Sequence, residues 1–402
     1  MNLRRQKLLD RGIGIPLLAI LKPLVILAGI ILKRDHTLPD PGLDRGGRIT
    51  VLKMLGGGSL VIALPALLGL RKRFPRVHFQ LVTTPSVAPF ARTLGVFDEI
   101  LTIEQNSVFA LAASALHALV KCFRSNCFID LEVYSKLSTV FSVFTCAHNR
   151  IGFYLENGIW RKPIHTHLIF FNRFAPVHLF YERVAILLGA EVATYQECQK
   201  LLRSVCKIPE VSASPQHGRP VVVIGSGCSA LGQERMFTAP EWSQIFRSQL
   251  EKNPALSDSR IVFLGGPEDQ TLADSILKIL YASHPNLEIE NLCGKLALTD
   301  SIRVLAEARE FWGIDSSLLH YARLLGRKCI SFWGPTAPFS RLKKFPIEEE
   351  VHYRKVPCSP CVHVTEFPPC NGNNVCMKSL VSPMTDDILE KNLPVFHGAP
   401  EF

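Results

Sequence analysis

The alternation of apolar and polar segments predicts a first α/β domain after residue 40. RITVLKML is an apolar run rich in β-branched residues, the glycines of GGGS follow it, and LVIALPALLGLRKRFP has helical spacing. VHFQLVTT is the next strand, so this stretch is expected to form the first βαβ unit of a doubly wound sheet. The strand candidates DEILTI and NCFIDLEVY continue the pattern on either side of the helical segment SVFALAASALHALVKCF. We therefore expect a Rossmann-like lobe over residues 41–210.

The same order of elements restarts at Arg219 and predicts a second lobe over residues 211–402. PVVVIGSG is a strand with a glycine turn, and PEWSQIFRSQLEKN, RIVFLGG and QTLADSILKILYASHP follow as helix, strand and helix. The segment CKIPEVSASPQHGR joins the two halves. The expected fold class is α/β, with two Rossmann-like doubly wound lobes facing a cleft. Ligands of such sheets bind beyond the carboxyl ends of the strands, so the loops after the strands are the candidate sites.

Residues 1–40 lie outside this alternation and are expected to form a membrane-anchoring helical segment and a linker. The stretch Gly12–Leu32 is apolar except for Lys22, is interrupted by Pro16 and Pro23, and has basic residues at both ends. A charge near the bilayer centre is costly, so an interfacial or re-entrant helix pair kinked at Pro23 is favoured over a single span. An amphipathic helix packed on the protein itself is the third alternative. The small-residue cleavage motif of a secretory signal does not follow the segment.

Size, net charge and cysteine content indicate which kinds of molecule the protein binds and in which compartment it lies. With 402 residues, 47% of them hydrophobic, the chain is large enough for two cores. The formal net charge is +10, and the first 34 residues contribute +6 of it through seven Lys or Arg and one Asp. This clustering beside an apolar segment indicates anionic membrane lipids, and the lack of a basic stripe interleaved with aromatic residues argues against nucleic acid. Twelve cysteines, most of them scattered singly, fit a reducing compartment.

The segment FWGIDSSLLHYARLLGRKCISFWGPTAPFSR is the main candidate for anion binding. A strand that ends at Asp315 meets a helix that begins near Ser316 or Ser317, so backbone N–H groups and the positive helix end point toward a ligand. A nucleotide diphosphate is the expected anion, with His320 one turn later on the same helix face and Thr336 in the loop after the next strand. From the residues alone, the alternative is an ordinary N-capped helix with a core-facing histidine.

Two glycine-rich loops are further candidates. Gly56, Gly57 and Gly58 are expected to turn the chain sharply with positive φ, and Ser59 then opens a helix. The alternative is a tight turn with a structural role only. The loop IGSGCSA, which ends at Ala230, formally matches a dinucleotide fingerprint after a strand. The helix that should follow at once is interrupted, so a loop on the donor side is the preferred interpretation.

Together these segments resemble glycosyltransferase family 9. The shared order is the glycine loop, LPALxxLRxRFP, IDL, RIGF, GGPED, NLCGK, DSSxxHYA, FWGPT and CSPC, over about residues 48–380. Members of the family are heptosyltransferase-like enzymes of the two-lobed GT-B architecture that require no metal or other cofactor for catalysis. The resemblance implies inverting transfer of a sugar such as heptose from a nucleotide-activated donor to lipopolysaccharide or a related glycan.

The resemblance also assigns roles to individual residues. The positions that match the donor-contacting residues of the family are Arg235, Asp315, Ser316, Ser317, His320 and Thr336. Ser317 replaces the glycine that usually follows the Asp-Ser pair, so the approach of the donor differs there. Arg235 stands where the family commonly has a lysine near the donor phosphates, which keeps the charge but changes its geometry.

The resemblance leaves the catalytic base open. Many members carry an aspartate at the position of Ser59, six residues before the proline that matches Pro65, and a serine does not accept the acceptor's proton unaided. Asp130 matches the aspartate of the family's IDL motif and, with the glycine loop, forms the expected acceptor side. Glu132, two residues further, would share the same strand face. Our hypothesis is that Glu132 replaces the missing base, and the alternative is a solvated Glu132 or one paired with Lys136.

Four cysteines near the C-terminus form the remaining cluster. Cys358 and Cys361 stand in a CSPC motif, and Cys370 and Cys376 follow. This group suits a tetrahedral thiolate site for a structural zinc ion, although its spacing is less regular than that of paired CxxC motifs. Packed free thiols, a disulfide and an iron–sulfur centre are the alternatives. In each case we expect the cluster to clamp a loop rather than to react.

The expected protein is therefore a membrane-associated glycosyltransferase at the cytoplasmic face of a bacterial inner membrane. Its expected partners are a nucleotide-sugar donor, a lipid-linked or lipopolysaccharide-type glycan acceptor and anionic membrane lipids. Ser59 supports one alternative, a catalytically silent glycan- or lipid-binding subunit of the same fold. A nicotinamide-dependent oxidoreductase is the third class, which the interrupted fingerprint disfavours.

Overall fold

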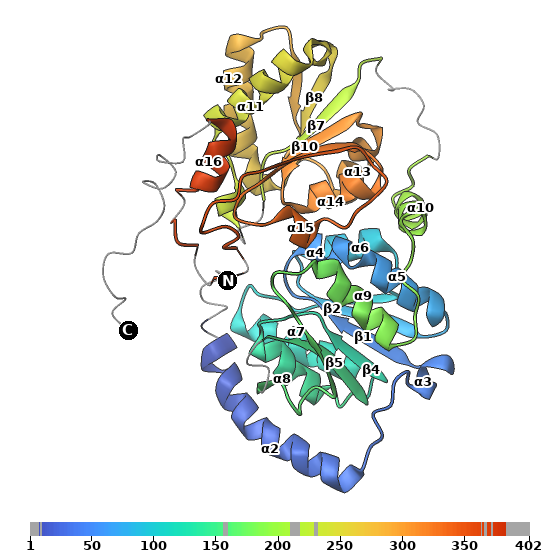
Figure 1. Ribbon diagram of the computed structural model, residues 1–402. Helices are drawn as coiled ribbons and strands as arrows, with labels where there is room; N and C mark the ends of the chain where they lie inside the picture. Colours follow the sequence, from blue (N-terminus) through green and yellow to red (C-terminus); the bar gives the residue numbers. More distant parts are fainter. Residues whose placement is uncertain are drawn as a thin grey trace, which may run out of the picture. The chain divides into compact units, whose positions relative to one another are not determined.

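The chain folds into two α/β units, residues 1–205 and 206–402, each built on a six-stranded parallel sheet (Figure 1). The structure is a computed structural model that describes Leu8 and residues 10–155, 160–209, 218–228, 232–362, 364–365, 368–370 and 373–382. Ala230 of the second glycine-rich loop falls outside these residues. The two doubly wound α/β lobes that the sequence predicts are confirmed.

The sheet of the first unit has the strand order β3-β2-β1-β4-β5-β6, and each pairing is parallel. Its strands are β1 Arg48–Leu52, β2 His78–Thr83, β3 Glu99–Thr102, β4 Cys127–Asp130, β5 Asn149–Tyr154 and β6 His167–Phe170. Its helices are α2 Gly14–Leu32, α3 Pro41–Asp44, α4 Gly57–Ile62, α5 Leu64–Arg73, α6 Ala88–Leu94, α7 Val108–Cys122, α8 Lys136–Phe144, α9 Val177–Leu187 and α10 Tyr195–Val205. The direction of winding reverses between β1 and β4, so the topological switch point lies at the carboxyl ends of these strands.

The sheet of the second unit has the order β12-β11-β10-β7-β8-β9, again with parallel pairing. Its strands are β7 Val221–Gly225, β8 Arg260–Phe263, β9 Glu288–Asn291, β10 Glu310–Ile314, β11 Lys328–Trp333 and β12 Glu349–Tyr353. Its helices are α11 Ala239–Lys252, α12 Gln270–Ser283, α13 Leu298–Glu307, α14 Ser317–Leu324, α15 Pro338–Arg341 and α16 Val375–Val381, with 3-10 turns η2 Gln233–Arg235, η3 Pro254–Asp258 and η4 Pro267–Asp269. Here the switch point lies between β7 and β10.

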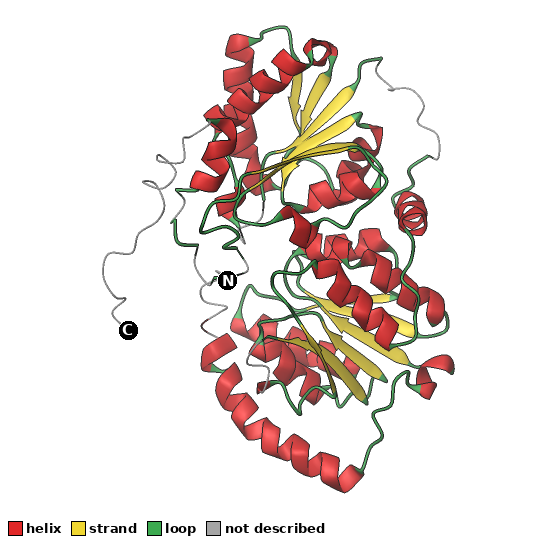
Figure 2. Cartoon of the chain, viewed as in Figure 1, coloured by secondary structure: helices red, strands yellow, loops and turns green. Residues whose placement is uncertain are grey.

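The strands form because short β-branched runs bury both of their faces between helices. The central strands β7 (VVVIG) and β10 (EFWGI) are buried at every position, which a parallel sheet covered on both sides requires (Figure 2). Helix ends are fixed by local signals. The Thr238 side chain and Glu241 form a capping box at the start of α11, and Pro65 stands in the first turn of α5.

The N-terminal apolar segment is one continuous helix, α2, rather than the predicted pair kinked at Pro23. Pro23 lies inside the helix and removes one backbone donor, which bends a helix without necessarily ending it, and α2 follows an arc in Figure 1. Among the described residues, this is the helix whose length and composition suit a membrane span. Leu18 packs against Val140 of α8, and the carboxylate of Asp10 accepts hydrogen bonds from the N–H groups that open α8.

Candidate active site

Three neighbouring strands of the second unit end at its switch point. The sheet order places β10 between β7 and β11, and the loops that leave these strands carry Ser226, Asp315 and Thr336. The carboxyl ends of parallel strands share one edge of the sheet, so the three loops lie at the same edge. This edge holds the predicted donor residues.

Asp315 and Arg235 form a buried ion pair across 80 residues of sequence. Nη1 of Arg235 lies 3.0 Å from Oδ2 of Asp315 and donates to the Asp315 carbonyl oxygen at 2.6 Å, and the two side chains are 12% and 6% exposed. His320, within the first turns of α14, places Nε2 3.7 Å from Oδ1 of Asp315. The structure thus brings together three of the residues that the sequence predicts at the donor.

The ion pair determines the charges at this edge. Burial alone would raise the pKa of Asp315, but the charge of Arg235 and the nearby His320 hold it well below its usual range. Burial lowers the pKa of His320, and Asp315 only partly opposes that effect, so the imidazole is neutral at pH 7. Burial also disfavours the charge of Arg235, yet Asp315 raises the pKa of this guanidinium.

Three buried hydroxyl groups at this edge have no hydrogen-bond partner among the residues that the structure describes. They belong to Ser226, Ser316 and Thr336. Ser316 occupies the N-cap position of α14 and His320 is buried, as in the alternative of an ordinary capped helix, but the Ser316 side chain makes no capping hydrogen bond. Leaving a buried hydroxyl unpaired costs about 1–3 kcal/mol. These three hydroxyls lie beside the first turn of α14, which begins at Ser317 without a side-chain cap. Hydroxyl and backbone N–H groups are the donors that the oxygen atoms of a diphosphate would accept from.

Two members of this edge are not among the predicted residues. Ser226 directly follows the strand PVVVIG, a position that a search for a glycine fingerprint overlooks. Arg341 ends α15, five residues after Thr336, and its charge lowers the pKa of both Asp315 and His320. Among the described residues, the first helical element after β7 is the 3-10 turn η2, and not the immediate helix of a dinucleotide fingerprint.

Asp269, at the end of η4 after β8, is an acidic group with a raised pKa at the adjacent strand end. Its side chain is buried and Oδ2 accepts a hydrogen bond from the N–H of Gly266 at 2.9 Å. Burial raises the pKa of Asp269 to about 6, the Gly266 hydrogen bond opposes the shift, and Glu268 adds to it.

Replacement of Asp269 by asparagine is expected to flatten the pH dependence of stability. A carboxyl whose pKa rises on folding loses stability as pH rises from its unfolded value of about 4 through its folded value of about 6. Asparagine keeps an acceptor for Gly266 but does not ionise. Denaturant unfolding should show a gain for the variant of about 2 kcal/mol near pH 7 and none near pH 4. Parallel pH profiles for the two proteins would contradict the raised pKa.

The glycine loop occupies the switch point of the first unit. Gly56 has φ of +81°, as predicted, but Gly57 and Gly58 do not have positive φ. At Gly57 a Cβ atom would lie 2.4 Å from the ring of Phe90, so close packing requires glycine there. Helix α4 begins at Gly57, two residues before the predicted start, and Ser59 therefore lies inside its first turn.

Glu132 is held against the segment that leads into the glycine loop. Its Oε1 accepts hydrogen bonds from Nζ of Lys53 at 2.9 Å and from the N–H groups of Met54 and Leu55 at 2.8 and 3.1 Å. The alternative of a solvated or Lys136-paired Glu132 is wrong, because the buried Lys53 is its partner. Burial disfavours the charge of Lys53, but Glu132 raises its pKa, so the ammonium remains charged.

Asp130 is fully buried in a polar cluster. Its Oδ2 lies 3.6 Å from Nη1 of Arg161 and 3.5 Å from Nε2 of His165, and it accepts a hydrogen bond from the Ser138 hydroxyl at 2.8 Å. Strand β4 ends at Asp130, so the prediction that both carboxylates share a strand face is wrong. The N–H of Glu132 instead donates to Oδ1 of Asp130 at 2.9 Å, and Asp130 thereby fixes the turn that carries Glu132.

The four C-terminal cysteines line one small pocket. They are Cys358, Cys361, Cys370 and Cys376, and all four are free thiols, which contradicts the disulfide alternative. Burial raises the pKa of Cys361 to about 11 and that of Cys376 to about 12. Within the described parts of the chain, no group of three or more His, Cys, Asp or Glu side chains is arranged to hold a metal ion.

The cysteine segment is bonded to the loop that carries Thr336. The N–H groups of Cys361 and Val362 both donate to the Pro335 carbonyl at 3.0 Å, and the hydroxyl of Ser359 donates to the carbonyl of Gly334. A Cβ atom at Gly334 would meet the Cys376 sulfur at 2.9 Å. The segment therefore restricts the position of residues 334–336.

The model of glycosyltransferase family 9 (heptosyltransferase) matches residues 179–369. The fold is similar to that of E. coli ADP-heptose lps heptosyltransferase II, with 15% identity, a TM-score of 0.56, and coverage of 83% of this chain and 98% of that one. It is also similar to E. coli heptosyltransferase WaaC with ADP-2-deoxy-2-fluoro heptose, with 15% identity, a TM-score of 0.55, and coverage of 86% of this chain and 99% of that one. A family 9 glycosyl transferase from Veillonella parvula is similar as well, with 15% identity, a TM-score of 0.54, and coverage of 76% of this chain and 85% of that one. No curated protein matches the chain by sequence.

Proposed function

We propose that this chain, a glycosyltransferase of family 9, transfers a sugar with inversion from a nucleotide-activated donor to a lipid-linked or lipopolysaccharide-type glycan. The observation that carries the proposal is the set of three unpaired buried hydroxyls around the Asp315–Arg235 pair at the switch point of the second unit. Heptose is the sugar we favour, because the similar E. coli structures are heptosyltransferases. Like the family in general, the chain would need no cofactor for the transfer.

In this proposal the second unit binds the donor diphosphate. The hydroxyls of Ser226, Ser316 and Thr336 donate to phosphate oxygens, and the first turn of α14 adds backbone N–H groups. When the bond between the sugar and the phosphate breaks, the diphosphate takes the electron pair, and Arg341 stabilises the added charge. Asp315 holds Arg235 in place and keeps the local charge balanced. His320 is neutral and orients Asp315.

The acceptor reaction requires a base, for which we propose Glu132. The acceptor hydroxyl attacks the anomeric carbon, the bond to the donor phosphate breaks, and the hydroxyl proton passes to the Glu132 carboxylate. Three donors on Oε1 hold this carboxylate against the segment before the glycine loop. Oε2 is the oxygen that would take the proton. Gly56 and its neighbours leave room for the acceptor, and Ser59 donates a hydrogen bond to it.

The location we propose is the cytoplasmic face of a bacterial inner membrane. Helix α2 is long, apolar and almost wholly exposed, and basic residues flank it at both ends. Its first half lies along α8 instead of projecting away from the lobe, which favours an interfacial position over a span. A lipid-linked acceptor would then reach the same lobe that α2 attaches to anionic lipids.

A second candidate is a catalytically silent glycan- or lipid-binding subunit of the same fold. Ser59 stands where many family members have their aspartate base, and both Asp130 and Glu132 already have cationic partners. Turnover separates the two functions, because a silent subunit binds a donor or glycan without releasing the nucleotide diphosphate.

The test of the proposed function is a thermal-shift screen of nucleotide sugars followed by a turnover assay. A donor present at about a hundred times its Kd should stabilise the folded chain by about 2.7 kcal/mol. The corresponding nucleoside monophosphate is the matched control, because it lacks the diphosphate that Ser226 and Thr336 are proposed to bind. Failure of every nucleotide sugar to stabilise the chain would refute the donor site, and binding without turnover would favour the silent subunit.

For the four cysteines we propose a structural clamp on the loop of Thr336, with zinc as the bound metal. Thiolates are preferred zinc ligands, and all four sulfurs line one pocket. Because burial keeps the thiols of Cys361 and Cys376 protonated, and the described residues are not arranged as a ligand set, zinc binding must deprotonate these thiols and close the segment around the ion.

Elemental analysis of the purified chain is expected to return about one zinc per molecule. Cys361→Ser should lose the metal and lower the melting temperature, whereas Cys146→Ser, at an exposed thiol in the other unit, should change neither. A chain with no bound metal would exclude zinc and leave packed free thiols as the clamp.

A further inference from the structure

Helix α7 of the first unit is apolar on both its inner and outer sides. Its inner side packs on the core through Ala118 and Cys122. Its outer side exposes Val108, Phe109, Leu116 and Val120, by 86%, 84%, 63% and 68%. A helix at the surface of a soluble lobe normally presents polar residues to water, and one that is apolar all round is normally buried in protein or lipid. The outer side of α7 therefore needs a covering partner.

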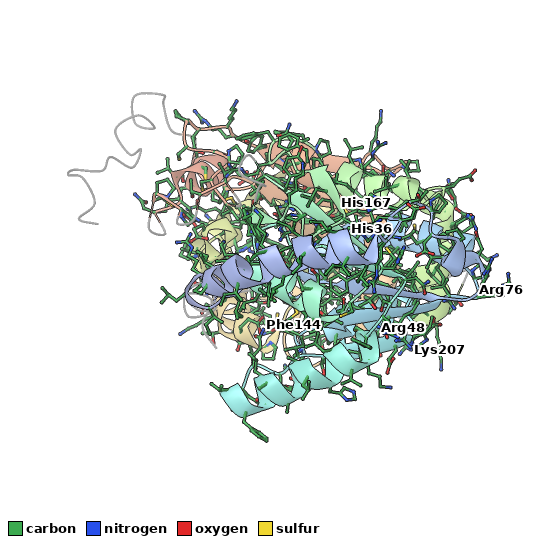
Figure 3. All side chains as sticks on the ribbon, turned by 90° about the horizontal axis from the view of Figure 1, so that it is seen from below. His36, Arg48, Arg76, Phe144, His167 and Lys207 are labelled. Carbon is green, nitrogen blue, oxygen red and sulfur yellow. The ribbon has the colours of Figure 1, made fainter. Side chains whose placement is uncertain are left out.

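The exposed side of α7 belongs to the same helix layer as α2. Helix α8 lies between them, since its Phe141 shares a core cluster with Ala118 of α7 and its Val140 packs on Leu18 of α2. Phe144 is the last residue of α8 and is 49% exposed. Figure 3, which views the molecule from below, shows it between α2 and α7. Exposed apolar groups thus continue across all three helices.

The charges of this layer favour an anionic partner. None of the chain's 35 Asp and Glu residues lies within α2, α7 or α8. Basic residues follow the helices, with Lys33 and Arg34 after α2 and Arg124 after α7. Docking of a second copy on this layer would bring like charges together, whereas anionic lipid headgroups would neutralise them. A bilayer is therefore the occupant that matches both the apolar side chains and the basic ends.

We propose that α7, Phe144 and the outer side of α2 form one surface that lies on an anionic bilayer. This inference rests on the proposed attachment through α2 and adds a second contact to it. Helix α7 has 15 residues and reaches only about 22 Å, too short to span a bilayer, so it lies in the headgroup region. A single interfacial contact leaves a lobe free to swivel, and a second one fixes the orientation of the acceptor side toward the lipid.

Vesicle flotation of the full chain tests the surface. Leu116→Glu should lower partition onto phosphatidylcholine–phosphatidylglycerol vesicles about tenfold, because it removes an apolar contact and adds a charge that anionic lipids repel. Leu179→Glu is the matched control, since Leu179 of α9 is 48% exposed and α9 packs on α5, which lies on the opposite face of the sheet. Equal partition of the two variants would overturn the proposal.

Photo-crosslinking identifies the occupant directly. A benzophenone side chain in place of Phe109 should form lipid adducts on vesicles, and the same group in place of Leu179 should not. Crosslinks between two copies at position 109, or no lipid adduct there, would overturn the bilayer as partner. Melting temperatures equal to wild type are expected for all variants, because the replaced side chains are exposed.

The outcomes also separate this proposal from the proposed function. If the wild-type chain does not float with vesicles, the attachment through α2 fails together with the second contact. If it floats but Leu116→Glu floats equally well, the α7 contact alone fails. Transfer to a detergent-dispersed acceptor should be unchanged in Leu116→Glu, because that acceptor does not depend on the membrane contact. Absence of turnover in the wild-type chain would refute the proposed enzyme activity but would not affect the proposed membrane surface.

Discussion

Arg235→Met is expected to abolish stabilisation by a nucleotide-sugar donor and to destabilise the fold by about 3–5 kcal/mol. The variant leaves the carboxylate of Asp315 buried without its ion-pair partner, so His320 and Arg341 alone oppose the effect of burial, which raises the pKa of that carboxyl. The variant also removes the guanidinium group that holds Asp315 at the sheet edge where the donor phosphates are proposed to bind. Denaturant unfolding measures the first effect, and thermal shift with the donor measures the second.

Two further variants separate stability from binding. Arg235→Met combined with Asp315→Asn removes both charges and should recover most of the stability, yet it should still fail to respond to the donor. Arg219→Met is the control, since Arg219 pairs with Glu288 at 3.7 Å on the exposed surface of the same unit, where an ion pair contributes about 0–1 kcal/mol. Full donor response in the double variant would refute a role of this pair in the donor site.

The Asp315–Arg235 pair also predicts the effect of acid. A carboxyl whose pKa is lowered on folding stabilises the fold above its unfolded pKa of about 4, and that contribution is lost as pH falls toward its folded pKa. The wild-type chain should therefore lose stability below about pH 4 more steeply than the double variant.

Glu132→Gln is expected to lower kcat by about 10²–10⁴-fold. Glutamine keeps an oxygen that accepts the N–H groups of Met54 and Leu55, so the segment before the glycine loop should stay in place. It does not accept the proton of the acceptor hydroxyl. Steady-state kinetics with donor and acceptor should show the loss in kcat, with donor binding by thermal shift unchanged.

The variant also leaves Lys53 buried without its carboxylate, so a control for folding is needed. The double variant Lys53→Met/Glu132→Gln has no unpaired charge and should recover stability without activity. Ser59→Asp, which restores the aspartate of many family members, should return activity to Glu132→Gln. Wild-type turnover in a folded Glu132→Gln protein would show that Glu132 is not the base, and the silent subunit or another base would then have to be considered.

The order of elements could be predicted from sequence because it depends on local patterns. Runs such as VVVIG fit only a strand that is buried on both faces, and the amphipathic segments between such runs fit the covering helices. The start of α14 at Ser317, directly after the strand that precedes Asp315, follows from the strand end and the helix spacing. Ser226 has no such signal, since a serine after a glycine turn is ordinary in sequence.

Details that depend on packing were not predictable. Proline statistics favour a break at Pro23, but α2 remains one helix. A strand of two further residues would have placed Asp130 and Glu132 on one face, but β4 ends at Asp130, whose carboxylate lies beside Arg161 and His165. These partners lie 31 and 35 residues away in sequence, beyond the reach of any local rule.

The sequence by itself determined two doubly wound lobes, the apolar N-terminal helix and the family resemblance, because periodicity and turn residues act over a few neighbouring positions. Only the tertiary structure decided which partners the charged groups have. Arg235 meets Asp315 across 80 residues, and Lys53 instead of Lys136 meets Glu132. A buried charge is costly unless an opposite charge or a hydrogen-bonding group lies beside it in the folded chain. The spacing of residues in the sequence does not show which group that will be.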